Sequence, residues 1–198
     1  MKEINAEKFK QLTQQVYDIA VAHGWHEKPL STEHYLGLVM TEVAEAVEAD
    51  RMNKRANTDM MAEVMRLQAE EGEGGLCWQW YESWFQVYYR EYIKGSIEEE
   101  FADIVIRIFD MAQGIHGDKM VWKGYYPYGD RFMQDKSFVE NAWHFTKETL
   151  NWGTMNITDS VFYIFDWADF LGIDLLTHIE WKMKYNELRE YKHGGKKY

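Results

Sequence analysis

The scarcity of proline is the feature that most constrains this sequence, because only two prolines occur in 198 residues. Proline ends or kinks a helix, so long stretches of the chain are free to be helical. Near the N-terminus, Phe9, Leu12 and Val16 recur at helical spacing. This spacing predicts an amphipathic helix over about residues 5–23. The sequence therefore favours an all-α fold.

Capping signals and the same apolar period predict the remaining helices. Ser31 or Thr32 is expected to cap the second helix, and Ser96 with Glu99 forms a capping box for a later one. Asp174 is expected to cap the last helix. The second predicted helix ends near residue 53. Further helices are predicted over about residues 54–74, 76–93, 96–112, 137–150, 158–170 and 174–191. Residues 117–135 are expected to form a loop or hairpin, and "EEGEGG" (70–75) marks a break.

Length and composition bound the class of protein. A chain of this length can bury one sizeable core, and we expect residues 1–198 to form a single domain. Acids outnumber bases by 33 to 22, which argues against nucleic acid and an anionic membrane as partners. The stretch "MKEINAEKFKQL" lacks an apolar core of signal-peptide type and no run approaches a membrane span, so neither segment is expected. Because Cys77 is the lone cysteine and cannot form an internal disulfide, a cytoplasmic protein is expected.

The segment "TEVAEAVEAD" (41–50) places acids in a helix that is otherwise apolar. On a helical wheel, Glu42 and Glu45 lie opposite the main apolar arc. That second side also carries Leu38 and Ala46, so the glutamates project from an apolar face. Burying a carboxylate costs several kcal/mol unless a cation compensates. The two glutamates therefore indicate a cation site.

A second acid pair has the same spacing. Glu100 and Asp103 lie three residues apart in "EEEFADIVIR", and Arg107 and Asp110 continue the stripe. Taken alone, this stripe is also compatible with a salt-bridged helix edge. Two such pairs on two apolar helices favour a shared site, because four carboxylates supply the oxygen ligands that Mg²⁺ prefers. The pattern lacks the thiolates and histidines that select zinc.

The last predicted helix carries the complementary charge. Lys182, Asn186 and Arg189 lie on the face that begins with Leu175 and Ile179. These side chains either extend to water from a bundle end or form an anion clamp beside the cation site. A clamp of this kind together with Mg²⁺ is what a polyphosphate requires.

The chain resembles the MazG-like family of all-α nucleoside triphosphate pyrophosphohydrolases. The resemblance rests on three motifs in this order: "EVAE", "EEFADIVIR" and "KMKYNELREYKHGGKK". The resemblance covers about residues 5–53, 93–116 and 156–197. It implies a helical bundle, usually a homo-oligomer (dimer or tetramer), that uses Mg²⁺ to split a nucleoside triphosphate into monophosphate and pyrophosphate. Relative to the family pattern, about residues 54–93 and 117–155 are insertions. The identity of the nucleotide therefore does not carry over.

The resemblance implies a role for each site residue. The expected metal ligands and catalytic residues are Glu42, Glu45, Glu100 and Asp103. The expected substrate-binding residues are Lys182, Asn186, Arg189 and Trp25. A metal-activated water would attack the α-phosphate, while the cations stabilise the leaving pyrophosphate. Trp25, in the loop before the second helix, is a candidate to stack on the base, and packing in the core or loop is the alternative.

Two other functions compete with this hypothesis. A di-iron bundle needs a Glu-x-x-His pair on each of two helices, and the sequence offers only Glu190 with His193. A non-catalytic helical interaction module would use the aromatic block at 76–92 as its binding surface.

The metal hypothesis makes structural predictions of its own. It requires antiparallel pairing of the helices near 35–53 and 96–114, with the carboxylates of Glu42 and Asp103 no more than about 10 Å apart. We also expect Glu42→Gln or Asp103→Asn to leave the fold intact or slightly stabilised, because crowded carboxylates repel one another.

Overall fold

Helices form the framework of the protein, as the near-absence of proline predicts. The computed structural model describes residues 3–71, 78–127, 132–150 and 157–192, and the all-α prediction is confirmed for them. The elements are α1 (Ala6–Ala22), α2 (Thr32–Arg51), α3 (Thr58–Glu71), α4 (Trp78–Tyr92), α5 (Ile97–His116), the 3-10 helix η1 (Gly117–Lys119), α6 (Phe138–Leu150), α7 (Ile157–Phe170) and α8 (Leu175–Glu187).

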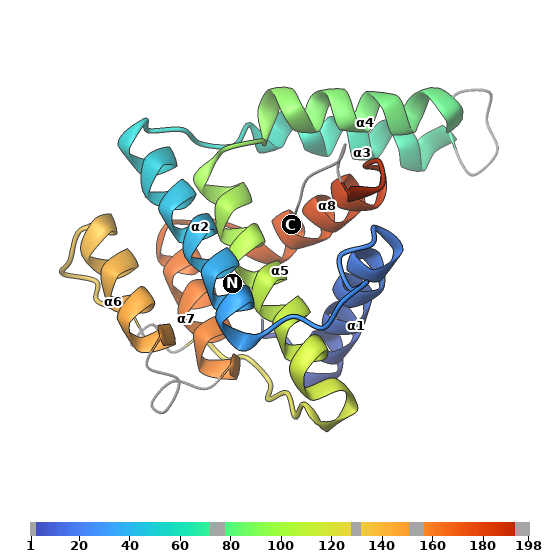
Figure 1. Cartoon of the computed structure of the whole chain (residues 1–198). Coiled ribbons are helices and arrows are strands. Elements are labelled where there is room, and N and C mark those ends of the chain that lie inside the picture. The colour runs from blue at the N-terminus through green and yellow to red at the C-terminus, as the bar shows by residue number, and fades with distance from the viewer. Residues whose placement is uncertain (1–2, 72–77, 128–131, 151–156, 193–198) are drawn as a thin grey trace.

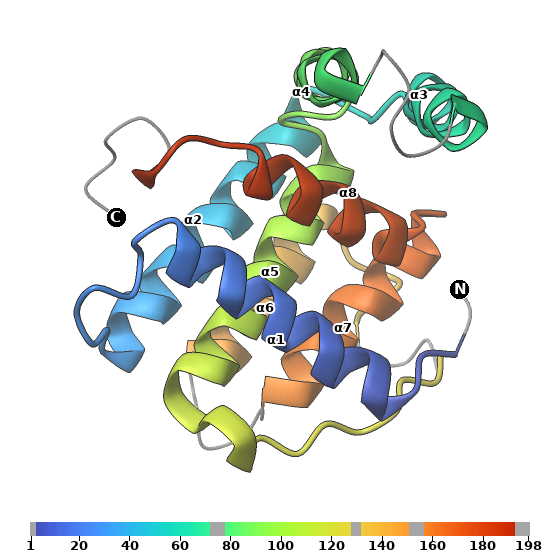
Figure 2. The same ribbon diagram turned by 90° about the vertical axis from the view of Figure 1, so that its right-hand side faces the viewer.

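Helix α5 runs through the middle of the molecule (Figures 1 and 2). It contacts α1, α2, α7 and α8, because most of its side chains are apolar and buried. Phe101, Val105 and Phe109 are fully buried. The first turn of the same helix carries Glu98, Glu99 and Glu100, and all three are buried as well. Three acids are thus placed inside the protein at the start of its central helix.

Helices α2 and α5 are antiparallel, as the metal hypothesis requires. The carbonyl of Lys54, just after α2, accepts a hydrogen bond from Ile97 N–H at the start of α5. At the opposite ends, a Cβ on Gly114 would lie 2.2 Å from the hydroxyl oxygen of Tyr35, so glycine permits the close approach. Helix α2 also contacts α6. Contacts with two helices explain why α2 has two apolar sides.

The predicted caps are found, with differences in detail. Ser31 and Ser96 each accept a backbone N–H bond at 3.2 Å with their side-chain oxygens. The carboxylate of Glu99 does not close the box onto Ser96; it accepts from Gly95 N–H instead. Asp174 is the residue before α8, but its carboxylate accepts from the Thr177 hydroxyl at 2.9 Å and bonds no backbone N–H.

Two segments that the sequence analysis treats as insertions have different structures. Helices α3 and α4 lie side by side at one end of the molecule (Figures 1 and 2), and α4 contacts α8 beside a small separate core. That core consists of Met61, Phe85, Tyr89, Ile93, Trp181 and Tyr185. In the second segment, Tyr125 pairs with Ile4 near the N-terminus. The described part of residues 117–135 is therefore the short helix η1 followed by a loop, and it contains no hairpin strands.

Several predictions fall on residues that the structure does not describe. They concern Cys77, the break after residue 71, the first part of the aromatic block and the tail from residue 193. Within the described ranges, no helix is long and apolar enough to cross a membrane.

Candidate functional site

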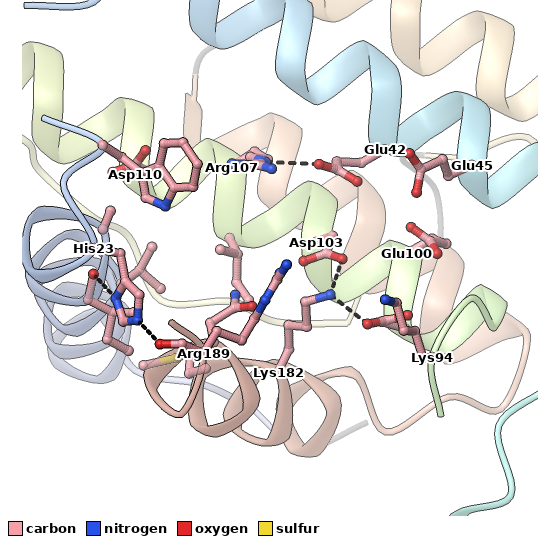
Figure 3. A pocket seen from close by; sticks show the side chains of 18 of the residues that line it. His23, Glu42, Glu45, Lys94, Glu100, Asp103, Arg107, Asp110, Lys182 and Arg189 are labelled. Atoms are coloured by element: carbon pink, nitrogen blue, oxygen red, sulfur yellow. Dashed lines mark hydrogen bonds and ion pairs between the residues drawn. The ribbon is translucent and has the colours of Figure 1, made fainter. Parts of the chain in front are cut away.

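A pocket opens where α1, α2, α5 and α8 meet, and all eight residues predicted from the sequence line it (Figure 3). They are Glu42, Glu45, Glu100, Asp103, Lys182, Asn186, Arg189 and Trp25. The pocket encloses about 260 Å³, whereas one water molecule takes roughly 30 Å³. It therefore has room for a ligand much larger than a single ion.

Three of the four predicted metal ligands converge. Glu42, Glu100 and Asp103 each offer a carboxylate oxygen, and these oxygens lie within 4.8 Å of one another. The required proximity of Glu42 and Asp103 is confirmed. Glu45 is more exposed and stands outside this group, but it lies beside Glu100 at the same end of the pocket (Figure 3). The donors are all carboxylate oxygens, which suit a hard divalent cation.

Two of the acids are ion-paired. Arg107 donates from Nε to Glu42 at 2.9 Å, and the Lys182 ammonium donates to Asp103 at 2.5 Å. These pairs resemble the salt-bridged edge that the sequence analysis left open. Glu100 differs, because its Oε2 is buried and has no hydrogen-bond partner among the described residues. An orphaned buried carboxylate oxygen fits a site that a cation completes.

The pKa values of the acids reflect their crowding. Burial, followed by the charges of Asp103 and Glu99, raises the pKa of Glu100 to about 9. Burial raises the pKa of Asp103 to about 7, although Lys182 acts in the opposite direction and Glu42 adds to the rise. At neutral pH and without a metal ion, Glu100 is therefore protonated. A divalent cation would reverse this balance, because it favours the ionised form.

The predicted anion clamp lies on the opposite wall of the pocket. Lys182 is only 8% exposed at its side chain and bonds Glu99 as well as Asp103, so it does not extend to water as the alternative requires. The Arg189 guanidinium lies 5.7 Å from the centroid of the Tyr185 ring. Asn186 has a buried Oδ1 for which the described residues supply no hydrogen-bond partner. Of these three side chains, Lys182 is the one that bonds the acids of the pocket.

A helix-ending motif places Trp25 in the lining of the pocket. Trp25 N–H donates to Ala20 O and Gly24 N–H donates to Val21 O, both at 3.0 Å, which is the Schellman pattern. Gly24 has φ 77°, and a Cβ there would lie 2.3 Å from the hydroxyl of Tyr191. Glycine is therefore required at this position. The half-buried Trp25 lines the pocket, so both stacking on a base and packing in the loop remain open to it.

The structure adds residues that the sequence analysis did not assign to the site. Glu99 was assigned only to a helix cap, yet it lines the pocket and bonds Lys182. His23 and Asp110 lie at the end of the pocket away from Glu45 (Figure 3). The ring nitrogens of His23 are 2.8 Å from Ile19 O and 2.9 Å from Arg189 O. The run of three acids at 98–100 was the available signal for Glu99, because three adjacent acids cannot all face solvent on a buried helix.

Comparison with protein-family models, with curated proteins and with solved structures finds no match to this chain. The site geometry and the resemblance of the motifs are therefore the basis for a functional proposal.

Proposed function

We propose that this protein is a Mg²⁺-dependent nucleoside triphosphate pyrophosphohydrolase of MazG-like type. One observation carries the proposal: Glu42, Glu100 and Asp103 converge within 4.8 Å, and Glu100 keeps an unpartnered buried oxygen there. The convergence supports a cation site, and the cationic wall opposite supports an anionic ligand. The order of the motifs along the chain supports the reaction type.

Glu42, Glu100 and Asp103 would hold the cation, with the more exposed Glu45 beside Glu100. A bound Mg²⁺ would supply charge neutralisation for the triphosphate and lower the pKa of a coordinated water. Glu100 would release its proton on binding the ion, because only its ionised form is a ligand.

The remaining lining residues would bind and orient the nucleotide. Arg189 and Asn186 lie on the wall opposite the acids and would donate to phosphate oxygens, as an anion clamp does. Trp25, also in the lining, would pack against the base. These contacts would fix the phosphate chain relative to the acids, and such positioning is a large part of phosphoryl-transfer catalysis.

Pyrophosphate release from a panel of ribo- and deoxyribonucleoside triphosphates, with Mg²⁺ and with EDTA, tests the proposal. We expect Mg²⁺-dependent release of pyrophosphate and monophosphate for at least one substrate, and loss of that release in Glu100→Gln and Asp103→Asn. Full activity in either variant, or release of single phosphate, would contradict the proposal.

We further propose a cytoplasmic homo-oligomer, either dimer or tetramer. The resemblance supports the assembly, and the lone cysteine supports the reducing compartment. Light scattering of the purified chain tests the assembly, and a monomer at micromolar concentration would refute it.

The helical interaction module is a second candidate function, and one observation favours it. Along α4, the rings of Trp84, Tyr88 and Tyr92 stack in succession, with centroids 5.9 and 5.7 Å apart. Trp84 is 53% exposed and Val87 57%. Exposed aromatic rows are typical of protein-binding surfaces. Under this hypothesis Trp84→Ala removes the biological effect of the protein and Glu100→Gln does not.

A further inference from the structure

Lys182 bridges two acids of different kinds. Its ammonium donates to Glu99 Oε1 and to Asp103 Oδ2, each at 2.5 Å. Asp103 belongs to the group of three converging carboxylates, whereas Glu99 does not. An ammonium has three donors, so Lys182 joins the proposed cation site to an acid outside it.

Glu99 is held in place without help from Lys182. Its second oxygen accepts from Gly95 N–H, and its own N–H donates to the Ser96 hydroxyl at 3.2 Å. The residue is 2% exposed, so it has neither space nor free rotation. Both of its carboxylate oxygens already accept hydrogen bonds from the chain. Glu99 is therefore a fixed anchor and a poor candidate for a metal ligand.

A cation at Asp103 weakens the bond of that carboxylate to Lys182. If Asp103 ligates a divalent ion, the ion repels the ammonium and withdraws electron density from both carboxylate oxygens. The stronger bond of Lys182 is then the one to Glu99. The ammonium keeps that bond and gains free donors on the pocket side, where Arg189 and Asn186 also lie.

We propose that Glu99 is a positioning residue, which retains Lys182 in the pocket when Asp103 ligates a cation and so converts Lys182 from an internal counter-ion into a phosphate ligand. This inference rests on the proposed function, because that function supplies the cation at Asp103. It needs no helix movement, since only the end of one side chain turns. Arg107 is more exposed, at 38% of its side chain, and would turn toward water or toward Asp110, whose charge also acts on it, when Glu42 ligates the ion.

A double-mutant cycle tests the proposal with Glu99→Gln, Lys182→Met and the double variant. The probes are Mn²⁺, followed by electron paramagnetic resonance, and inorganic tripolyphosphate, followed by calorimetry in the presence of Mn²⁺. We expect each single variant to weaken tripolyphosphate binding by about tenfold, the usual effect of one charge-assisted hydrogen bond. The double variant should be no weaker than Lys182→Met. Glu99→Gln should still bind Mn²⁺, whereas Asp103→Asn should not.

Glu98→Gln is the matched control. Glu98 lies in the same helical turn and is 4% exposed, but it bonds Arg55 at 2.5 Å and Ala56 N–H at 2.9 Å, away from Lys182. This variant removes the same charge from the same helix and should keep the tripolyphosphate affinity. Circular dichroism checks that each variant is folded.

A measurement on the wild-type protein covers the case in which Glu99→Gln does not fold. The Lys182 ammonium should give a protected ¹⁵N–¹H signal that shifts and persists when Mg²⁺ is added. Disappearance of the signal on adding Mg²⁺ would overturn the proposal, because it would mean that the ammonium is released to water.

Two results of the cycle would also overturn it. Additive losses in the double variant would show that Glu99 acts independently of Lys182, and loss of Mn²⁺ binding in Glu99→Gln would make Glu99 a ligand. A protein that passes the cycle but hydrolyses no nucleotide would overturn the proposed function and leave the role of Glu99 standing.

Discussion

Replacing Glu100 with glutamine should stabilise the metal-free protein. Glu100 is 4% exposed, and its pKa rises from the ordinary value of 4.5 to about 9. The folded state therefore prefers the protonated carboxyl, while the unfolded chain is ionised at neutral pH. Between 4.5 and pH 7 lie about 2.5 pH units, and each corresponds to about 1.4 kcal/mol. Glu100 thus costs the fold up to about 3 kcal/mol at pH 7, and glutamine removes this cost.

The sign of the pH dependence follows from the raised pKa. Below about pH 4.5 both states of the wild-type protein carry a neutral Glu100, so the variant and the wild type should be equally stable. As the pH rises, the unfolded wild-type chain gains stability by ionising, and the advantage of Glu100→Gln should grow until about pH 9. The experiment is urea unfolding in EDTA between pH 4.5 and 9, with the free energy of unfolding extrapolated to water.

Glu98→Gln provides the comparison of opposite sign. Glu98 is as buried as Glu100, but Arg55 and Ala56 N–H satisfy it. Loss of these bonds should destabilise the fold by about 1–3 kcal/mol. If Glu100→Gln were destabilised to the same extent as Glu98→Gln, or if its advantage did not change with pH, Glu100 would be satisfied in the folded protein and our account of the site would fail.

Three further predictions concern the same acids and the central helix pair. Mg²⁺ affinity should rise by up to tenfold per pH unit between pH 7 and about 9, because Glu100 must lose its proton to bind. Calorimetric titration of Mg²⁺ at several pH values measures this slope, and Glu100→Gln should lack it. Glu42→Gln should destabilise the metal-free protein by about 1–3 kcal/mol, because it removes the carboxylate that pairs Arg107, and unchanged urea unfolding would contradict the pair. Gly114→Ala should lower the thermal midpoint through its clash with Tyr35 and cost about 1–3 kcal/mol.

A matched glycine tests the last prediction. Gly37 is interior to α2, and a Cβ there would have no atom within 4 Å. Gly37→Ala should raise stability by about 0.5–1 kcal/mol through helix propensity alone. Equal effects of both substitutions would show that the crossing of α2 and α5 is looser than described.

The positions of the site residues could be predicted from the sequence because helix geometry fixes them. Glu42 and Glu45, like Glu100 and Asp103, are three residues apart, and this spacing places two side chains on one face of any helix. The pairing of two such helices then brings the faces together. Local spacing and one antiparallel contact were therefore sufficient to place these four acids at one pocket.

The partner of each acid could not be predicted in this way. Arg107 is 65 positions from Glu42, and Lys182 is 79 positions from Asp103. Spacing says nothing about which of several nearby cations reaches which acid. The expectation that Glu42→Gln relieves repulsion overlooked the bond to Arg107, and we now expect relief at Glu100 instead. Glu99 was likewise assigned only to a local cap, so its contact with Lys182 was missed although the run of acids at 98–100 indicated a buried position.

The end of the last helix shows the same limit. The sequence predicts helix to about residue 191, whereas α8 ends at Glu187. Beyond it, Arg189 O bonds the His23 ring and Lys192 N–H donates to His23 O. Backbone groups that would continue the helix are bonded to the end of α1 instead. This tertiary competition turns the chain back over the pocket and places Arg189 at its wall.

Glu100 destabilises the metal-free fold and suits a cation as a ligand for the same reason. An acid that is fully bonded within a protein is stable, but its lone pairs are occupied and a cation must displace a partner to reach them. Glu42 and Asp103 approach this state, since Arg107 bonds Oε1 of Glu42 and Lys182 bonds Oδ2 of Asp103. Glu100 keeps a buried oxygen that no described residue bonds. A cation can therefore bind that oxygen by displacing one proton. The N-terminus of α5 offsets only part of the cost of ionising the buried Glu100. A bound cation removes the rest of that cost. A purely structural site would have no reason to leave a buried oxygen of this acid unbonded between two acids that are paired.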